Sequence, residues 1–497
     1  MDQRAKMPVS LPSANPTVSY WQDPPDAIAD HRSTPDLPSS ADTVIIGSGI
    51  TGAAVAWNLL QSTNPGSIVM LEARQACSGA TGRNGGHTKA ASYRTFTHHV
   101  STLGLAAAKQ IARLELANIL SVHAFARDHS IDCDLNPCQT IDVIYDPAQW
   151  DEAVASVCAM RDAFPSGEPE GQYELYSAEE VKERFHVHDG VYQGREEKVQ
   201  GGVGYFAGSL SAYRFGVGVL RLCLGRGLNL QTGTPATVLE KKVDDGGGMW
   251  WEAKTPRGVI RAKRVVLATN GYTAAVWPRL QGVVVPLRGQ VTVQRPGSRM
   301  PRRGCLPRTY SFIYDKGYEY MVPRPEGSRF AGDIVMGGGL VRAPDDGLLE
   351  FGTTDDAAVN DGISEYLKET APRYFGPDWG EDDPEGRVRS EWTGIMGFSP
   401  DGFPLVGKVR GEEGLWASCS FQGHGMVLCW MCAKALVEMM EDRDGEQIIE
   451  WFPDAFRIAE ERLALRFQGR LDAIPKTREP SAAERQMTSC VANSVWQ

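Results

Sequence analysis

Three glycines and one acidic residue lie at spacings suited to binding a dinucleotide. Gly47, Gly49 and Gly52 form a G-x-G-x-x-G pattern, and Glu72 follows twenty residues after the last of them. The first glycine permits a tight turn, the second lets a pyrophosphate approach the backbone, and the third allows a helix to pack closely on a strand. A carboxylate at this distance can bond a ribose diol, which favours NAD or FAD over the phosphorylated ribose of NADP.

The flanking residues predict the elements that would position this pattern. An apolar run at residues 43–46 leads into the first glycine, and small residues follow the third glycine. A second apolar run at residues 68–71 ends at Glu72. These features predict a strand, a turn, a helix and a second strand, which is the context the glycine pattern requires. A nucleotide site is therefore favoured over a glycine-rich turn that binds nothing.

A second glycine-rich segment follows at once, CSGATGRNGGH at residues 77–87. It is too long and too rich in glycine for a simple connection between a strand and a helix. FAD needs a second loop that covers its ribityl chain and pyrophosphate, whereas NAD does not. The two segments together predict FAD. NAD-dependent dehydrogenation is a weaker alternative, because the chain has no second G-x-G-x-x-G.

Composition limits the possible partners. The chain has 497 residues, 42% of them hydrophobic, which is enough for a large core and roughly two to four domains. A formal net charge of −11 makes nucleic acid or an anionic membrane an unexpected partner.

No apolar run has the length of a signal peptide or a membrane span. Ten cysteines without a regular pattern favour a reducing, cytoplasmic location, and Cys429 with Cys432 lacks the second pair that a metal site would need.

Several longer motifs carry a family resemblance. Together they resemble the FAD-dependent D-amino acid oxidase and amine oxidoreductase superfamily, nearest the branch typified by gamma-glutamylputrescine oxidoreductase and its fungal relatives. The resemblance spans roughly residues 8–445 and is specific for the family but not for a substrate. The motifs are NPTVSYW, SGATGRNGG, KRVVLATNGYT, VPLRGQV, WTGIMGFSPDGFPLVG and SCSFQGHGM.

The resemblance implies an α/β (α+β) fold in which a Rossmann-type FAD-binding domain carries an inserted substrate domain on a large mixed β-sheet. The FAD-binding domain would be discontinuous. We expect an N-terminal extension at 1–39, FAD-binding segments at 40–100, 200–275 and 390–445, substrate-binding segments at 101–199 and 276–389, and a C-terminal helical segment with a mobile tail at 446–497.

Hydrophobic periodicity predicts one long helix at residues 104–130, within the inserted part. Its apolar residues are expected to cluster on one side: Ile111, Leu114, Ala117, Ile119 and Leu120.

The family resemblance also implies which residues contact FAD. Glu72 would meet the adenosine ribose, Arg74 would flank the adenine, and only the main chain of Ala236 would be needed. Thr269 and Asn270 could equally be ordinary strand ends. The expected contacts are Gly47, Gly49, Ile50, Thr51, Gly52, Glu72, Ala73, Arg74, Ser78, Thr81, Arg83, Asn84, Gly85, Gly86, Ala236, Thr269, Asn270, Gly271, Gly423, His424, Gly425 and Met426.

His424 stands between Gly423 and Gly425, just before an apolar helical run. In relatives this turn lies beside the flavin pyrimidine ring, where two-electron reduction creates negative charge. The glycines would let the backbone come close, and the helix N-terminus would supply a partial positive field. His424 could add a hydrogen-bond donor or a protonated ring. A purely structural histidine remains the alternative, and its charge state is open.

Aromatic and cationic residues are candidates for the substrate pocket. Tyr318, Tyr320 and Trp392 could desolvate an amine or hold its cation by cation–π contact. Arg288 could line the same pocket, and an arginine would be needed to clamp the carboxylate of an amino acid. Packing in the core is the competing interpretation for each aromatic residue.

Two departures from other branches of the family bear on the cofactor. Some relatives attach FAD covalently through a histidine or a cysteine, but Arg83 and Gly394 stand near those positions, so we expect noncovalent FAD. A sister branch carries a lysine that activates oxygen, and Val335 stands near that position. Either His424 or a cation elsewhere would then have to assist the reaction with oxygen.

The family chemistry implied is an amine or amino acid oxidase reaction. Hydride passes from a carbon next to the amine nitrogen to flavin N5, giving an imine, with O2 as the expected electron acceptor. The expected partners are therefore a small-molecule amine or amino acid and O2, while the oligomeric state is left open. The alternatives are dehydrogenation of a C–O or C–C bond in a specialised metabolite, and a flavoprotein without catalytic activity.

Overall fold

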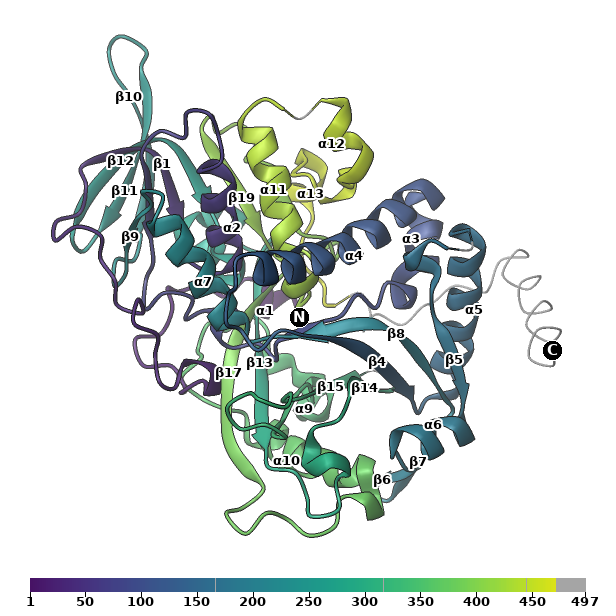
Figure 1. Cartoon of the computed structure of the whole chain (residues 1–497). Coiled ribbons are helices and arrows are strands. Elements are labelled where there is room, and N and C mark those ends of the chain that lie inside the picture. The colour runs from purple at the N-terminus through teal and green to yellow at the C-terminus, as the bar shows by residue number, and fades with distance from the viewer. Residues whose placement is uncertain (166, 316, 444, 471–497) are drawn as a thin grey trace.

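Two large β-sheets and the helices around them make up the fold. The computed structural model describes residues 1–470 except 166, 316 and 444. Figure 1 shows the first sheet at the upper left and the second sheet below it, with the long helix α4 (Leu105–Asp128) crossing between them. No helix of the described chain combines the length and the apolar character that a membrane crossing requires.

The first sheet places the glycine turn at one of its edges. Its central strand β1 (Ser40–Ile46) pairs in parallel with both β2 and β12. Ile46 is in register with the last residue of each neighbour, so the carboxyl ends of the three strands meet. Ligands of open α/β sheets bind at such an edge. The other strands are β2 (Ile68–Leu71), β9 (Asn229–Gln231), β10 (Val238–Val243), β11 (Met249–Thr255), β12 (Gly258–Leu267), β18 (Leu405–Lys408) and β19 (Leu415–Cys419).

Helices cover the first sheet where its central strands end in apolar residues. Val44, Ile45 and Ile46 are at most 4% exposed, as expected for a parallel sheet covered on both faces. The helix after the glycine turn is made of small buried residues such as Ala53 and Ala54, which let it approach its neighbours closely. The buried residues of this helix pack in one apolar cluster with residues of two further helices. The three helices are α2 (Ile50–Leu59), α7 (Ala212–Leu224) and α11 (Cys429–Met440).

The second sheet is mixed and mainly antiparallel. Its order is β17-β13-β16-β15-β14-β4-β8-β3, with β5 also paired to β8, and β14 and β4 run parallel. Its strands are β3 (His87–Thr88), β4 (Asn136–Ile144), β5 (Glu174–Ser177), β8 (Gly201–Ser209), β13 (Val285–Gln294), β14 (Arg308–Tyr314), β15 (Gly317–Pro323), β16 (Ile334–Gly337) and β17 (Val388–Phe398).

The two faces of this second sheet differ in chemistry because side chains alternate along each strand. One face packs an aromatic core, in which Phe312 stacks on Tyr374 with ring centroids 3.8 Å apart. On the other face Tyr320, Ser311 and Asp142 are consecutive partners across three strands. Polar groups inside a large sheet need partners. This polar row therefore marks the face where chemistry can occur.

The remaining elements surround the two sheets. A small hairpin is formed by β6 (Gly190–Tyr192) and β7 (Arg195–Glu197). The other helices are α1 (Asp2–Ala5), α3 (Tyr93–Leu103), α5 (Pro147–Ala163), α6 (Ala178–Phe185), α8 (Thr273–Val276), α9 (Pro344–Gly347), α10 (Asp361–Phe375), α12 (Glu446–Trp451) and α13 (Glu460–Ala464).

The predicted α/β architecture with a large mixed sheet is confirmed. The predicted helix at 104–130 is α4, but the expectation for Leu120 is wrong: it is 46% exposed. Leu120 follows Ile111 by nine residues, which at about 100° per residue puts it on the opposite side of the helix. The division into domains stays a prediction. Two strands from segments predicted to bind FAD, β8 and β17, belong to the second sheet, where neither is a neighbour of the other. The tail from residue 471 lies outside the described chain.

Candidate functional site

The turn at the end of β1 leaves no room for a side chain at Gly47 or Gly52. Gly47 has φ +106°, and an added Cβ would lie 2.5 Å from the Ala268 carbonyl oxygen. A Cβ on Gly52 would lie 2.0 Å from the carbonyl oxygen of Gly47, so the third glycine lets α2 approach the strand. Gly49 precedes α2, and the amide of Ile50 donates to Thr81 Oγ1 at 2.9 Å. The turn thus presents a helix N-terminus to the second glycine-rich segment.

Glu72 lies directly beside this turn. One carboxylate oxygen accepts from the Ser48 amide at 3.1 Å and the Ser48 hydroxyl at 2.5 Å. The other accepts from the Arg74 amide at 2.9 Å, and the residue is only 9% exposed. The carboxylate is therefore oriented by backbone groups at the strand edge where a ribose is expected.

Two buried hydroxyls near the turn fit a nucleotide-binding site. The Ser78 hydroxyl and the Tyr272 hydroxyl have no hydrogen-bond partner among the described residues. Burial raises the pKa of Tyr272, so its hydroxyl remains a donor, and the charges of Glu72, Arg74 and Arg83 act on it. Buried polar groups rarely lack partners in native proteins. Phosphate or ribose oxygens at this position would supply them.

A buried ion cluster holds the second glycine-rich segment. Asp356 is fully buried, and its carboxylate lies 2.9 Å from Arg74 Nη1 and 3.7 Å from Arg83 Nε. Burial lowers the pKa of Arg83 to about 10, while Asp356 opposes that shift, so the guanidinium is charged at neutral pH. Arg83 Nε also donates to the carbonyl of Thr393 at 2.6 Å. Both arginines predicted to lie along FAD are thus fixed by the segment that carries Asp356.

The rest of this loop packs against the polar face of the second sheet. The Asn84 side chain accepts from the Gly86 amide at 2.7 Å. A Cβ on Gly85 would lie 2.1 Å from the Tyr320 ring, and one on Gly86, where φ is +73°, would lie 2.1 Å from the carbonyl oxygen of Leu210. Glycine is therefore required at both positions because another chain segment occupies the side-chain space.

The residues that follow β12 support the His424 turn. Asn270 Oδ1 accepts from the amides of Ser420 and Phe421 at 3.0 and 3.2 Å. Thr269 contacts Thr273 through their hydroxyls at 3.0 Å. A Cβ on Gly271 would lie 2.3 Å from the carbonyl oxygen of Met396. The other predicted contacts are Thr51, which is buried in α2, Ala73, which is half-buried after β2, and Ala236, which is 2% exposed in the core of the first sheet.

The His424 turn is anchored from α4 by one buried amide. Asn118 Nδ2 donates to the carbonyl of Met426 at 3.0 Å, and Asn118 Oδ1 accepts from the amide of Met431 at 3.0 Å. Gly423 has φ +75°, which permits the reversal before the histidine. Sequence analysis missed Asn118, although a polar residue on the apolar side of a helix is a signal for a buried partner.

The environment of His424 favours a neutral imidazole. Its Nδ1 lies 3.1 Å from the carbonyl oxygen of Gln422, so the Nδ1–H donates there and Nε2 is left as an acceptor. One side of the ring is open to solvent. Surrounding protein lowers the pKa of His424, and the cations of Arg94 and Lys89 lower it further. A protonated ring, one of the two sequence-based alternatives, is therefore disfavoured at neutral pH.

Lys89, one of two cations whose charge acts on His424, was not among the predicted site residues. Lys89 Nζ donates to Asp142 Oδ1 at 2.6 Å and to the Ser311 hydroxyl at 2.5 Å. Asp142 also accepts from the hydroxyls of Tyr93 and Tyr205 at 2.9 and 2.7 Å. Burial alone would raise the pKa of Asp142, but the Lys89 ammonium holds it below its usual value. The signal was an aspartate within the apolar run of β4, since a buried charge requires a partner.

The predicted pocket residues divide into two groups. The guanidinium of Arg94 lies 5.1 Å from the Tyr318 ring centroid, and the Tyr320 ring centroid lies 6.4 Å from that of His87. Tyr318 therefore lies against Arg94, and Tyr320 lies against His87. In contrast, Trp392 is fully buried and donates from Nε1 to the carbonyl of Arg83 at 2.8 Å. Arg288 pairs with Glu350 at 2.6 Å.

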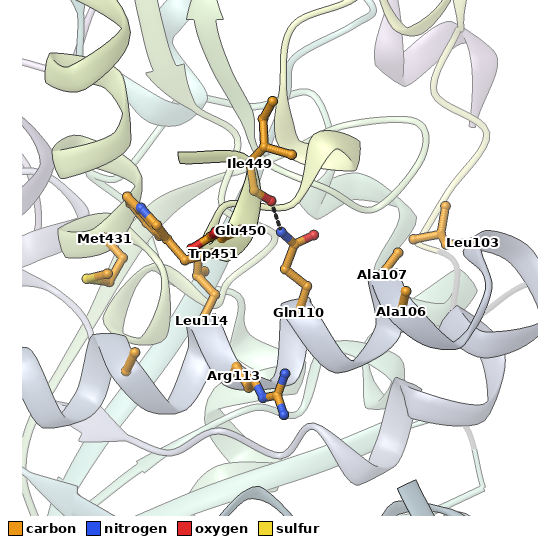
Figure 2. A pocket seen from close by; sticks show the side chains of 11 residues that line it. Leu103, Ala106, Ala107, Gln110, Arg113, Leu114, Met431, Ile449, Glu450 and Trp451 are labelled. Carbon is orange, nitrogen blue, oxygen red and sulfur yellow. Dashed lines mark hydrogen bonds between the residues drawn. The ribbon is translucent and has the colours of Figure 1, made fainter. Parts of the chain in front are cut away.

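A cavity of about 550 Å³ lies elsewhere, between α4, α11 and α12 (Figure 2). Its walls are mainly apolar, and Gln110 Nε2 bridges it by donating to the carbonyl of Ile449 at 2.6 Å. None of the residues predicted for the FAD or substrate site lines this cavity. It is therefore separate from the glycine turns and from His424.

Comparison with known proteins settles the family. The family model described as FAD dependent oxidoreductase (DAO) matches residues 42–439. The chain belongs to this FAD-dependent oxidoreductase family. The predicted superfamily, the predicted cofactor FAD and the prediction of an oxidoreductase enzyme are thereby confirmed.

Individual members of the FAD-dependent oxidoreductase family are similar over most of the chain. The probable oxidoreductase OrdL of Rhizobium meliloti is 26% identical over 422 residues, covering 83% of this chain and 86% of that protein. Gamma-glutamylputrescine oxidoreductase of Escherichia coli is 22% identical over 410 residues, covering 81% and 84%. The crystal structure of glycine oxidase from Geobacillus kaustophilus matches with a TM-score of 0.63 at 18% identity, covering 83% and 98%. This likeness confirms the predicted fold.

Replacing Gly49 by tryptophan should abolish FAD binding by this oxidoreductase. An added Cβ already meets Thr81 Oγ1 at 2.8 Å, and an indole would fill the space at the start of α2. Flavin absorbance of the purified variant measures the occupancy. The matched control is Gly445→Trp, where an added Cβ meets nothing within 4 Å. Full flavin occupancy in Gly49→Trp would contradict the assignment of the turn.

Replacing Asp356 by asparagine should destabilise the protein by about 3–5 kcal/mol, because two buried guanidinium groups would lose their counter-charge. Denaturant unfolding monitored by tryptophan fluorescence measures the change. The neighbouring Asp355, whose side chain is 55% exposed, provides the control Asp355→Asn. An Asp356→Asn variant within about 0.5 kcal/mol of the unaltered protein would show that the cluster contributes little.

Proposed function

We propose that this FAD-dependent oxidoreductase oxidises a C–N bond of an amine or amino acid and passes the electrons to O2. The proposal is supported by the Lys89–Asp142 ion pair at 2.6 Å and by the Arg94 guanidinium 5.1 Å from the Tyr318 ring centroid, the charges of Lys89 and Arg94 both acting on His424. FAD, when bound, supplies the hydride acceptor and then the two-electron donor to O2.

The positive charges of Lys89 and Arg94 would favour the reactive form of an amine. A nearby positive charge disfavours a second one, so Lys89 and Arg94 would lower the pKa of a bound substrate amine. The neutral amine is the form whose neighbouring C–H can leave as hydride. The carbon loses a hydride, the nitrogen loses a proton, and a C=N bond forms. A dedicated general base is unnecessary for a substrate that arrives deprotonated.

The aromatic groups would hold such a substrate away from water. Tyr318 and Tyr320 project from the same face of β15, because they are two residues apart. Burial raises the pKa of Tyr320, so its hydroxyl is neutral at physiological pH. The neutral hydroxyl and apolar ring of Tyr320 suit an uncharged amine. The same cations could attract the carboxylate of an amino acid.

Lys89 also suits the reaction with O2. Val335, at the position where a sister branch has its oxygen-activating lysine, is fully buried in the core. Lys89 provides a cation from a different element, held by Asp142. O2 gains two electrons and two protons to become hydrogen peroxide, and a fixed positive charge stabilises the anion that develops on the way.

Anaerobic mixing with a panel of amines and amino acids tests the proposed function. We expect at least one nitrogen compound to bleach the flavin absorbance, and admission of air to restore it with formation of peroxide. Alcohols and hydroxy acids serve as the matched panel for C–O oxidation. Bleaching by that panel alone would overturn the proposal.

Replacing Lys89 by methionine should slow reoxidation of the flavin by O2 by about 10²-fold, which is the usual cost of removing one stabilising donor. Because Asp142 would be left as a buried unpaired charge, the double variant Lys89→Met/Asp142→Asn should be measured beside it. Stopped-flow reoxidation at several O2 concentrations gives the rate constant. The exposed Lys263 provides the control Lys263→Met. Equal rate constants in all variants would exclude Lys89 from the oxygen reaction.

A further inference from the structure

We propose that residues 13–22, the N-terminal strap, are a positioning element of the FAD site. The strap precedes the region matched by the family model, which begins at residue 42. It lies against the second glycine-rich loop, residues 82–86, and the inference rests on the proposed contact between that loop and FAD. The strap would hold the loop in the shape that binds the cofactor before the cofactor arrives.

Side chains of the strap and of β17 hold three consecutive loop carbonyls. The Ser19 hydroxyl donates to the carbonyl of Gly82 at 2.6 Å, and Trp21 Nε1 donates to that of Asn84 at 2.6 Å. The carbonyl between them, that of Arg83, accepts from Trp392 Nε1 at 2.8 Å. A backbone whose successive carbonyls are all held has little freedom to rotate.

The strap also fixes the one long side chain of the loop. Arg83 Nη2 donates to the Thr17 hydroxyl at 2.7 Å and to the Thr17 carbonyl oxygen, and Nη1 donates to Gln22 Oε1 at 3.3 Å. Thr17 in turn donates from its amide to the carbonyl of Asp356 at 2.8 Å. The strap therefore closes over the buried cluster of Asp356 with Arg74 and Arg83.

Aromatic packing keeps the strap in place. Tyr20 stacks on Trp392 with ring centroids 6.3 Å apart and planes within 8° of parallel. Trp21 is 8% exposed, and the Arg324 guanidinium lies 4.9 Å from its ring centroid. Val18, between Thr17 and Ser19, is 70% exposed. Thr17 and Ser19 thus face the loop while Val18 faces the solvent.

Such a strap matters because the loop sequence is intrinsically flexible. Gly82, Gly85 and Gly86 have more backbone freedom than any other residue type, and ordering them costs conformational entropy. If the loop is ordered beforehand, FAD binding does not bear that cost. If only a tenth of the molecules held the competent loop shape, the apparent dissociation constant for FAD would rise tenfold.

The test compares strap variants that keep the fold but lose a contact to the loop. Trp21→Phe removes the donor to Asn84 while keeping an aromatic ring, and Thr17→Val removes the hydroxyl that Arg83 contacts. Thr17→Ser restores the hydroxyl, and Val18→Ala changes the exposed residue between them. The dissociation constant of FAD is measured by titrating the apoprotein, and thermal unfolding is followed with and without FAD.

We expect Trp21→Phe and Thr17→Val to raise the dissociation constant of FAD about tenfold and to reduce the thermal shift on adding FAD. Thr17→Ser and Val18→Ala should match the unaltered protein. If Trp21→Phe and Thr17→Val lowered the unfolding temperature of the apoprotein while leaving the dissociation constant unchanged, the strap would be structural only. FAD affinity is independent of the bond oxidised, so this outcome is distinguishable from failure of the proposed function.

Discussion

The burial of one carboxylate between two guanidinium groups constrains the whole site. Asp356 has no exposure to solvent, and Arg74 and Arg83 reach it from the end of β2 and from the second glycine-rich loop. A buried charge is tolerated only when its partners are fixed. The strap, the loop, β17 and the segment around Asp356 must therefore be in place together. This cluster ties the edge of the first sheet to the second sheet.

The rest of the site divides its tasks between the two sheets. The first sheet supplies the ends of parallel strands, a helix N-terminus and Glu72, all suited to the nucleotide. The second sheet supplies one polar face, on which Asp142 holds the Lys89 ammonium beside the turn of His424. Burial lowers the pKa of the Lys89 ammonium, and the charge of Asp142 opposes that shift. Burial is also the main cause that lowers the pKa of His424, with smaller contributions from Arg94 and Lys89.

Local patterns made the nucleotide half predictable. The glycine spacing and Glu72 report directly on backbone conformation. The strands predicted at 43–46 and 68–71 correspond to β1 (Ser40–Ile46) and β2 (Ile68–Leu71). Lys89 with Asp142 and Asn118 with Met426 join residues that are distant along the chain, and such pairings depend on strand register and helix packing. Arg288 and Trp392 show the same limit: their types suggested a pocket, and the structure engages them with Glu350 and with the loop carbonyl.

One FAD molecule is expected to contact the glycine turn, the second loop and the His424 turn, and hydrogen–deuterium exchange with and without FAD tests this most directly. We expect FAD to slow exchange in three separated segments, residues 47–52, 82–87 and 423–427. Protection confined to residues 47–52, with the second loop and the His424 turn unchanged, would contradict it.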